Sequence, residues 1–187
     1  MNVKMILSAV KVLRQGGVVA HPTDTCYGLA VDIFNKAALE RLYELKGMSQ
    51  EKPVSILVRS LKEAKEYGEF SKIALDLAAR YWPGSLTLVV PRTEKAPVFL
   101  NSKQDTIGIR VIVEDWTKNL LEAFGSPLST TSANKHGQAS PYSVAEILVQ
   151  PDFLIDGGNL DPKNQPSTIV EVIGAQKRIL RQGNIVV

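Results

Sequence analysis

The sequence predicts a single α/β domain around a mixed, twisted sheet. Segments with helical spacing of apolar residues intermix along the whole chain with short apolar runs that are typical of buried strands. The chain has 187 residues, which suits one well-buried domain and is marginal for two. We find no internal repeat, low-complexity tract or linker, and we therefore expect one domain over residues 1–187.

The first half of the chain supplies helices and strands in alternation. Apolar residues at helical spacing predict the first helix, and two glycines end it: Val3, Ile6, Leu7, Val10 and Leu13, then Gly16 and Gly17. The following elements are a buried strand over 18–21, a helix capped by Asn35 and closed by Gly47, a strand over 53–58, and a helical region from Ser60 to the breaker Pro83–Gly84.

The second half continues the same mixture. We expect strands over 86–91 and 106–113 with a loop between them, an amphipathic helix over 115–125, a strand over 127–132, a short helix over 143–150, and short strands over 153–158, 168–173 and 177–183.

Composition narrows the class of protein. Hydrophobic residues make up 44% of the chain and charged residues 22%, which is ordinary for a soluble globular domain. The net charge of +3 is too weak to indicate nucleic-acid binding by itself. The single cysteine, Cys26, excludes an internal disulfide and a cysteine-built zinc site. The sequence contains no apolar run of about 18 residues and no signal-peptide pattern, so we expect a cytoplasmic protein without membrane contact.

One strand carries polar side chains on a single face. In TIGIR, Thr106, Gly108 and Arg110 share one face, while Ile107 and Ile109 point to the core. A hydroxyl and a guanidinium with nothing between them would form a cradle for an anion. For an isolated strand of this kind, a solvated arginine at a sheet edge is an equally good interpretation.

Three further segments are similarly rich in hydroxyl groups. Each alone reads better as turn chemistry than as a binding site. Four such segments in one chain, two of them with an arginine, make a shared pocket the better interpretation. Their side chains are Thr23, Thr25 and Tyr27 in PTDTCYG, Thr130, Ser132 and Asn134 in LSTTSAN, and Ser167 and Arg181 near the end of the chain.

The other candidate residues fit structural roles better. His21 precedes a proline at a strand end, and Cys26 lies in an apolar segment as a packed thiol. His136 follows Ser132 without the G-x-S-x-G turn that activates a serine. The sequence also lacks a P-loop and a G-x-G-x-x-G motif, so any nucleotide is held by another device.

Six short motifs in order resemble those of one known family. HPTDTCYGL, ELKGMSQEKPVSILV, TIGIRV, STTSAN, PSTIVEV and ILRQG are similar to the signatures of the YrdC-like L-threonylcarbamoyladenylate synthases, over nearly the whole chain. The resemblance implies a single α/β domain with a twisted, open sheet, flanking helices and a large concave cavity. It also implies a nucleotidyltransferase that makes threonylcarbamoyl-AMP and pyrophosphate from ATP, L-threonine and bicarbonate, and that supplies the tRNA threonylcarbamoyl-transferase machinery which modifies adenosine 37 of tRNA.

The resemblance also assigns roles to residues by matching position. Threonine would be held by Thr25, Arg110, Thr130 and Ser167. The nucleotide would be bound by Lys46, Lys52, Thr106, Ser132, Asn134, Ser140 and Arg181. Lys46, Arg110 and Arg181 would carry the catalytic charges. Mg²⁺ would accompany ATP, and no dedicated metal site on the protein is expected.

One departure from the family pattern leaves alternatives open. Members of the family usually have a K-x-R motif where this chain has Lys46-Gly47-Met48. The thioether of Met48 cannot neutralise a phosphate. A paralogue with weakened synthase activity is therefore an alternative. A second is a YrdC-like protein that binds double-stranded RNA or tRNA through Lys46, Lys52, Arg110 and Arg181.

Overall fold

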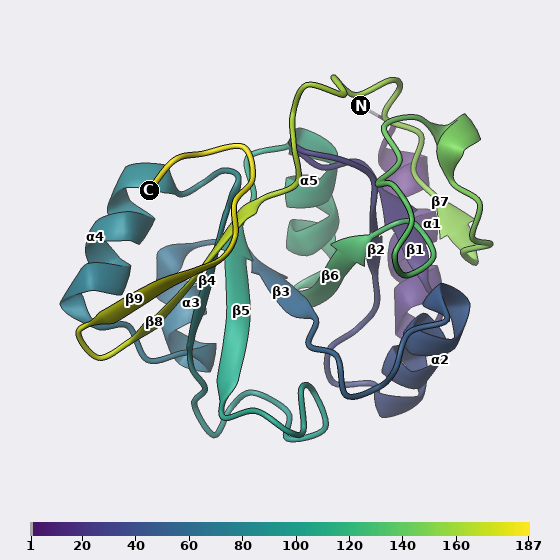
Figure 1. Ribbon diagram of the computed structural model, residues 1–187. Coiled ribbons are helices and arrows are strands. Elements are labelled where there is room, and N and C mark those ends of the chain that lie inside the picture. The colour runs from purple at the N-terminus through teal and green to yellow at the C-terminus, as the bar shows by residue number, and fades with distance from the viewer. Residues whose placement is uncertain (1) are drawn as a thin grey trace.

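A nine-stranded mixed sheet forms the centre of the structure, a computed structural model that describes residues 2–187 (Figure 1). The strands are β1 (Val19–His21), β2 (Gly28–Ala30), β3 (Ser55–Val58), β4 (Leu86–Pro91), β5 (Thr106–Val111), β6 (Leu128–Ser132), β7 (Phe153–Leu154), β8 (Thr168–Ile173) and β9 (Gln176–Arg181). Their order is β7-β1-β2-β6-β3-β5-β4-β8-β9, with parallel pairing only in β1–β7, β3–β5 and β4–β8. Because β7 and β9 end the sheet without pairing to each other, the sheet is open, as expected.

Five helices flank this sheet in the described part of the chain. They are α1 (Val3–Arg14), α2 (Lys36–Lys46), α3 (Leu61–Tyr67), α4 (Lys72–Tyr81) and α5 (Asp115–Phe124). The side chain of Asn35 caps α2 by accepting a hydrogen bond from the N–H of Ala38, at 3.1 Å. Gly47 closes α2 with a φ of 58°, a left-handed conformation that favours glycine. None of the five helices is both long and apolar enough to cross a bilayer, within residues 2–187.

Two apolar clusters lie on opposite sides of the strands. Alternation along β3 shows the division: Ile56 and Val58 belong to the larger cluster, under α2, α3 and α4, whereas Leu57 belongs to the smaller one, under α1 and α5. The smaller cluster draws on β1, β2, β3 and β6 and on none of β4, β8 and β9. The same side of β4, β5, β8 and β9 is thus left for other contacts, and in Figure 1 the near side of β5 carries no helix.

Four elements differ from the expectation. The strand expected over 153–158 is only the two-residue β7, Phe153–Leu154. The helical region after Ser60 is two helices, because Gly68 leaves the helix to form a bridge with Arg92, and Ser71 caps a new start. The short strand β2 was not predicted, since GLA is too short to show alternation. The helix expected over 143–150 is wrong: only Val144–Glu146 forms a 3₁₀ turn, and the backbone is already extended at Ile147.

His21 joins β1 to α5 in the interior. Its Nδ1 lies 2.7 Å from Thr117 Oγ1, and the Thr117 hydroxyl in turn donates to the carbonyl oxygen of Pro22 at 2.6 Å. Because that hydroxyl proton is used, Nδ1 carries the proton of the ring, and Nε2 is a buried acceptor without a partner in the described residues. Burial lowers the pKa of His21 from 6.5 to about 4, so the ring is neutral.

Candidate functional site

Strand register places two arginines on one face of the sheet. Arg110 of β5 lies beside Leu57 of β3, and Arg181 of β9 lies beside Ile169 of β8, which in turn lies beside Thr87 of β4. Side chains at matched positions of neighbouring strands point to the same side. The face left uncovered by α1 and α5 therefore carries a guanidinium at each end of a short polar stretch.

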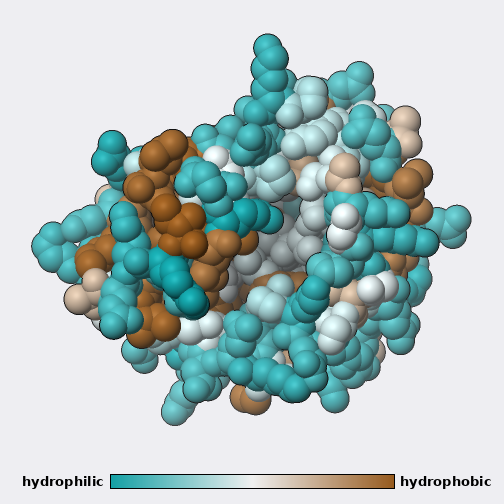
Figure 2. All heavy atoms as spheres, in the orientation of Figure 1, coloured by the Kyte–Doolittle hydropathy of each residue, from teal (hydrophilic) through white to brown (hydrophobic). Residues whose placement is uncertain are grey.

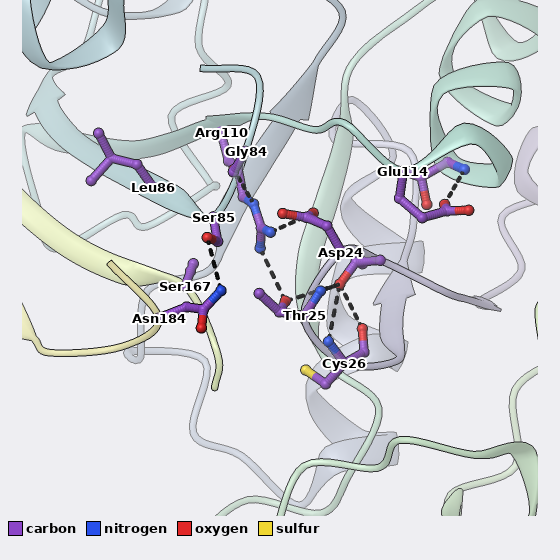
Figure 3. Close-up of polar contacts among 12 residues, drawn as sticks. Asp24, Thr25, Cys26, Gly84, Ser85, Leu86, Arg110, Glu114, Ser167 and Asn184 are labelled. Carbon is purple, nitrogen blue, oxygen red and sulfur yellow. Dashed lines mark hydrogen bonds and ion pairs between the residues drawn. The ribbon is translucent and has the colours of Figure 1, made fainter. Parts of the chain in front are cut away.

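Arg110 is held in one orientation by three partners. Its Nε donates to the carbonyl oxygen of Gly84 at 3.0 Å, its Nη2 to Asp24 Oδ1 at 2.6 Å, and its Nη1 to Thr25 Oγ1 at 3.4 Å (Figure 3). The residue is only 5% exposed. A guanidinium has five N–H groups, so two of them have no partner among residues 2–187 and are available to a carboxylate.

The loop between β1 and β2 brings Asp24 and Thr25 to this arginine. The Thr23 hydroxyl organises the loop, because its oxygen accepts from the N–H groups of Thr25 and Cys26 at 3.1 and 3.2 Å and donates to the Cys26 carbonyl at 2.6 Å. Side-chain hydroxyls of this kind replace backbone partners in tight turns. The threonines in PTDT therefore have two roles: Thr23 stabilises the loop, and Thr25 contacts Arg110 in the site.

Arg181 and Thr87 fix the position of Ser167. Arg181 donates from Nε and Nη2 to the Ser167 carbonyl at 3.0 and 2.8 Å, and Nη2 also reaches Ser167 Oγ at 3.1 Å. The Ser167 hydroxyl lies 2.9 Å from Thr87 Oγ1. Partial burial lowers the pKa of Arg181 below its usual value, and the positive charge of Arg110 contributes to the lowering. The two guanidinium groups thus affect each other electrostatically across the site.

These groups surround a small polar cavity of about 150 Å³. Its lining is Pro53, Ser55, Thr87, Arg110, Thr130, Thr131, Ser167, Ile169 and Arg181. A second cavity of about 350 Å³ adjoins it. The two cavities share the lining residues Pro53, Ser55 and Ile169, and the second is also lined by Thr106. Figure 2 shows the surface hollowed near the middle of this view. The polar cavity and the second cavity share three lining residues, so they are parts of one concave region.

Gly108 has a different role from the one expected. Its position on the polar face is as expected, and it lines the second cavity together with Thr106. Ser55 of the neighbouring strand β3 approaches it closely and lines the same cavity. A Cβ at position 108 would collide with the Ser55 hydroxyl. The Ser55 hydroxyl thus narrows the cradle between Thr106 and Arg110, and glycine is needed there for the close approach of that side chain.

Lys46 contacts the turn after β6 rather than a cavity. Its ammonium donates to the carbonyl oxygens of Ser132 and Asn134 at 2.5 and 2.7 Å and reaches Asn134 Oδ1 at 3.4 Å. Its own carbonyl accepts from the N–H of His136 at 2.9 Å. Burial lowers the pKa of Lys46 to about 8. Lys46 therefore ties the end of α2 to the turn, with its charge directed at backbone carbonyls.

Two of the predicted nucleotide residues, Asn134 and Ser140, line a third cavity. It measures about 380 Å³ and is lined by Asn134, Gln138, Ala139, Ser140, Pro141, Glu146 and Leu148. Its loop is joined to the site loop by the N–H of Tyr27, which donates to the Pro141 carbonyl at 2.9 Å. Lys52 is exposed and contacts the ring of His136. Met48 does not face a cavity but packs, partly buried, against the larger apolar cluster.

Cys26 lies between the two groups of predicted residues. Burial raises the pKa of its thiol, while side-chain hydrogen bonding to Ser140 and Thr25 and the positive charges of Arg110 and Arg181 act in the opposite direction. The thiol is thus near residues from both the threonine set and the nucleotide set. The structure brings Thr25, Arg110, Thr130, Ser167 and Arg181 together, places Ser140 and Asn134 in a neighbouring cavity, and leaves Lys46 and Lys52 outside the lining of these cavities.

Sequence reasoning missed three residues of the site: Asp24, Ser55 and Thr87. Thr87 alternates with buried Leu86 and Leu88, which is the signal that identified Thr106 and Arg110 and was overlooked in this strand. Ser55 shows no such signal, because its role depends on the partner strand.

Comparison with known proteins gives a consistent family. The family model for Sua5, YciO and YrdC, described as telomere recombination, matches residues 11–183. A threonylcarbamoyl-AMP synthase of Pseudoalteromonas translucida is 34% identical over 181 residues, covering 91% of this chain and 95% of the relative. The uncharacterized protein YciO of Escherichia coli is 31% identical over 186 residues, covering 96% of this chain and 89% of the relative.

A solved structure extends the likeness to a ligand complex. Sua5 of Pyrococcus abyssi, complexed with L-threonine, superposes with a TM-score of 0.88 at 31% identity. The match covers 95% of this chain and 54% of that protein, so the chain spans about half the length of the archaeal relative.

Proposed function

The chain belongs to the Sua5/YciO/YrdC family, and from that premise we propose that it is a threonylcarbamoyl-AMP synthase. The single observation that carries the proposal is the cavity in which Arg110 offers two free N–H groups beside the hydroxyls of Thr130 and Ser167. A planar fork with nearby hydroxyls suits a small hydroxy amino acid, whose carboxylate and side chain need different partners. The archaeal relative complexed with L-threonine supports the same ligand.

The reaction requires positioning more than it requires a protein nucleophile. The amine of threonine and bicarbonate combine, with loss of water, to a carbamate. A carbamate oxygen then attacks the α-phosphorus of ATP, and the bond to the pyrophosphate oxygen breaks. Holding the reactants in line and offsetting negative charge on the phosphoryl oxygens are the tasks left to the protein.

The residues divide between these tasks. Arg110 binds the carboxylate of threonine through two parallel hydrogen bonds, and Thr25, Thr130 and Ser167 contact its polar groups. Arg181 lies in the same cavity and offsets charge on the phosphoryl group. From Arg181 the nucleotide extends along one of two paths. One passes Ser132, Asn134 and Ser140, and the other passes Thr106. Lys52 is assigned to the phosphates.

Mg²⁺ fits this site as a companion of ATP. The described residues hold no group of three or more histidine, cysteine or acidic side chains that would form a metal site. Mg²⁺ in nucleotide enzymes is bound largely by substrate phosphates and water, so the ion would enter with ATP. When bound, the ion supplies charge neutralisation of the phosphates.

Pyrophosphate release tests the function. We expect it to need ATP, threonine and bicarbonate together, so that omission of either threonine or bicarbonate stops it. Arg110→Ala should abolish the threonine-dependent rate, and Arg80→Ala, on the exposed surface of α4, is the matched control. Arg110→Lys keeps the charge without the fork and should recover little activity. A normal rate in Arg110→Ala would refute the assignment.

The product is proposed to feed the transferase machinery that modifies tRNA in the cytoplasm. Direct binding of RNA stays a prediction, and it would show as an affinity that falls steeply with salt and ignores threonine.

A further inference from the structure

Asp24 contacts the substrate-facing arginine and has no role in the assignments made so far. Its carboxylate forms an ion pair with Arg110, with Oδ1 at 2.6 Å from Nη2 and with side chains only 15% and 6% exposed. Within residues 2–187, Arg110 is the one hydrogen-bond partner of the carboxylate. Figure 3 shows the two side chains pointing toward each other, from the β1–β2 loop and from β5.

The charges of the cavity are one-sided without Asp24. The lining contains two guanidiniums and no acidic side chain. An α-amino acid is a zwitterion, whose ammonium group is attached to the same carbon as its carboxylate. If Arg110 holds the carboxylate, the ammonium lies within reach of the groups that border Arg110. Asp24 does not line the cavity itself, but it is the acidic group that contacts Arg110.

We propose that Asp24 receives the α-ammonium group of the amino-acid substrate, so that the Asp24–Arg110 pair selects a zwitterion. The proposal rests on the proposed function and adds a specificity-determining residue to it. Oδ1 is occupied by Arg110, and Oδ2 of the partly exposed carboxylate accepts the hydrogen bond from the ammonium.

A purely structural ion pair is the competing explanation, and Asp24→Asn separates the two. The amide oxygen of asparagine still accepts a hydrogen bond from Nη2, so Arg110 stays anchored, while the negative charge is lost. The readout is calorimetric binding of two ligands: L-threonine, and (R)-3-hydroxybutyrate, which keeps the carboxylate and the hydroxyl but has no ammonium.

The expected result is a change in ligand preference. The preference of the wild-type protein for threonine over 3-hydroxybutyrate should fall about tenfold or more in Asp24→Asn, the size expected for one charge-assisted hydrogen bond. Affinity for 3-hydroxybutyrate should be unchanged or higher, because a negative charge near its carboxylate has gone. Asp76→Asn, whose side chain is 65% exposed on α4, should leave both affinities unchanged.

Several outcomes would overturn the proposal. Equal losses for both ligands would assign Asp24 a structural role only, and unchanged affinities would assign it none. If Asp24→Asn does not fold, the wild-type protein still decides: binding 3-hydroxybutyrate as tightly as threonine would exclude recognition of the ammonium. A wild-type protein that binds no threonine would instead refute the proposed function itself.

Discussion

Acidification should destabilise the protein through one histidine. His21 is buried and neutral, and burial lowers its pKa from 6.5 in the unfolded chain to about 4 in the folded one. Below pH 6.5 the unfolded state therefore binds a proton that the folded state does not. The contribution of this histidine to stability is complete above pH 6.5 and is lost as the pH falls toward 4.

The size of the effect follows from the two pKa values. A shift from 6.5 to about 4 corresponds to about 3 kcal/mol in total, of which about 2 kcal/mol is already lost at pH 5. This is a large fraction of the ordinary stability of a domain, which is about 5–15 kcal/mol. Glu114, whose pKa burial raises, acts with the opposite sign, so a variant is needed to isolate the histidine.

Urea unfolding at several pH values between about 7 and 4 measures the effect. His21→Asn keeps a donor near Thr117 Oγ1 and removes the titrating ring, so its stability should depend less on pH than that of the wild type, by about 2 kcal/mol at pH 5. The chain has only one other histidine, His136, which is exposed, and His136→Asn is the matched control that should keep the wild-type slope. Equal slopes in the wild type and His21→Asn would refute the reasoning.

Two further substitutions test contacts of the site. Gly108→Ala should lower the free energy of unfolding by about 1–3 kcal/mol, because the added Cβ collides with the Ser55 hydroxyl. Ser55→Ala in the same chain should restore part of that loss. No recovery in the double variant would show that the collision is not the cause. Lys46→Met should lower the free energy of unfolding by about 1.5–3 kcal/mol, since one buried and one part-buried carbonyl lose a charged donor. Exposed Lys52→Met should cost less than about 0.5 kcal/mol in the same urea titration. Equal costs for the two lysines would contradict the tie between α2 and the turn.

Much of the fold could be predicted, because its signals are local. Asn35 and Gly47 mark the ends of α2, and the alternation in TIGIR identifies which side of β5 is buried. The elements that differ depend on context that a single segment does not contain. Gly68 leaves its helix to pair with Arg92, 24 positions later, and β2 exists only because β1 and β6 lie on either side of it.

The residues of the site also fall into those that local sequence signals predict and those that depend on a distant segment. Alternation and turn chemistry identified Thr25, Thr130 and Arg110, because their side chains follow from their own strand or loop. Ser55 could not be identified, since what decides its role is the glycine opposite it on β5. The lysine of the K-x-R-like motif was expected at a phosphate, but its three acceptors lie in a turn that only the folded chain brings close.

The contact between Thr25 and Arg110 joins positions 85 residues apart, and the cavity is completed by Arg181 near the other end of the chain. No single segment of the chain contains all the side chains that bind the amino acid. A partly folded intermediate therefore has no complete binding site for it. Threonine therefore distinguishes the finished molecule from every partly assembled one, and its presence during refolding should draw the population toward the native state by mass action without speeding the early steps.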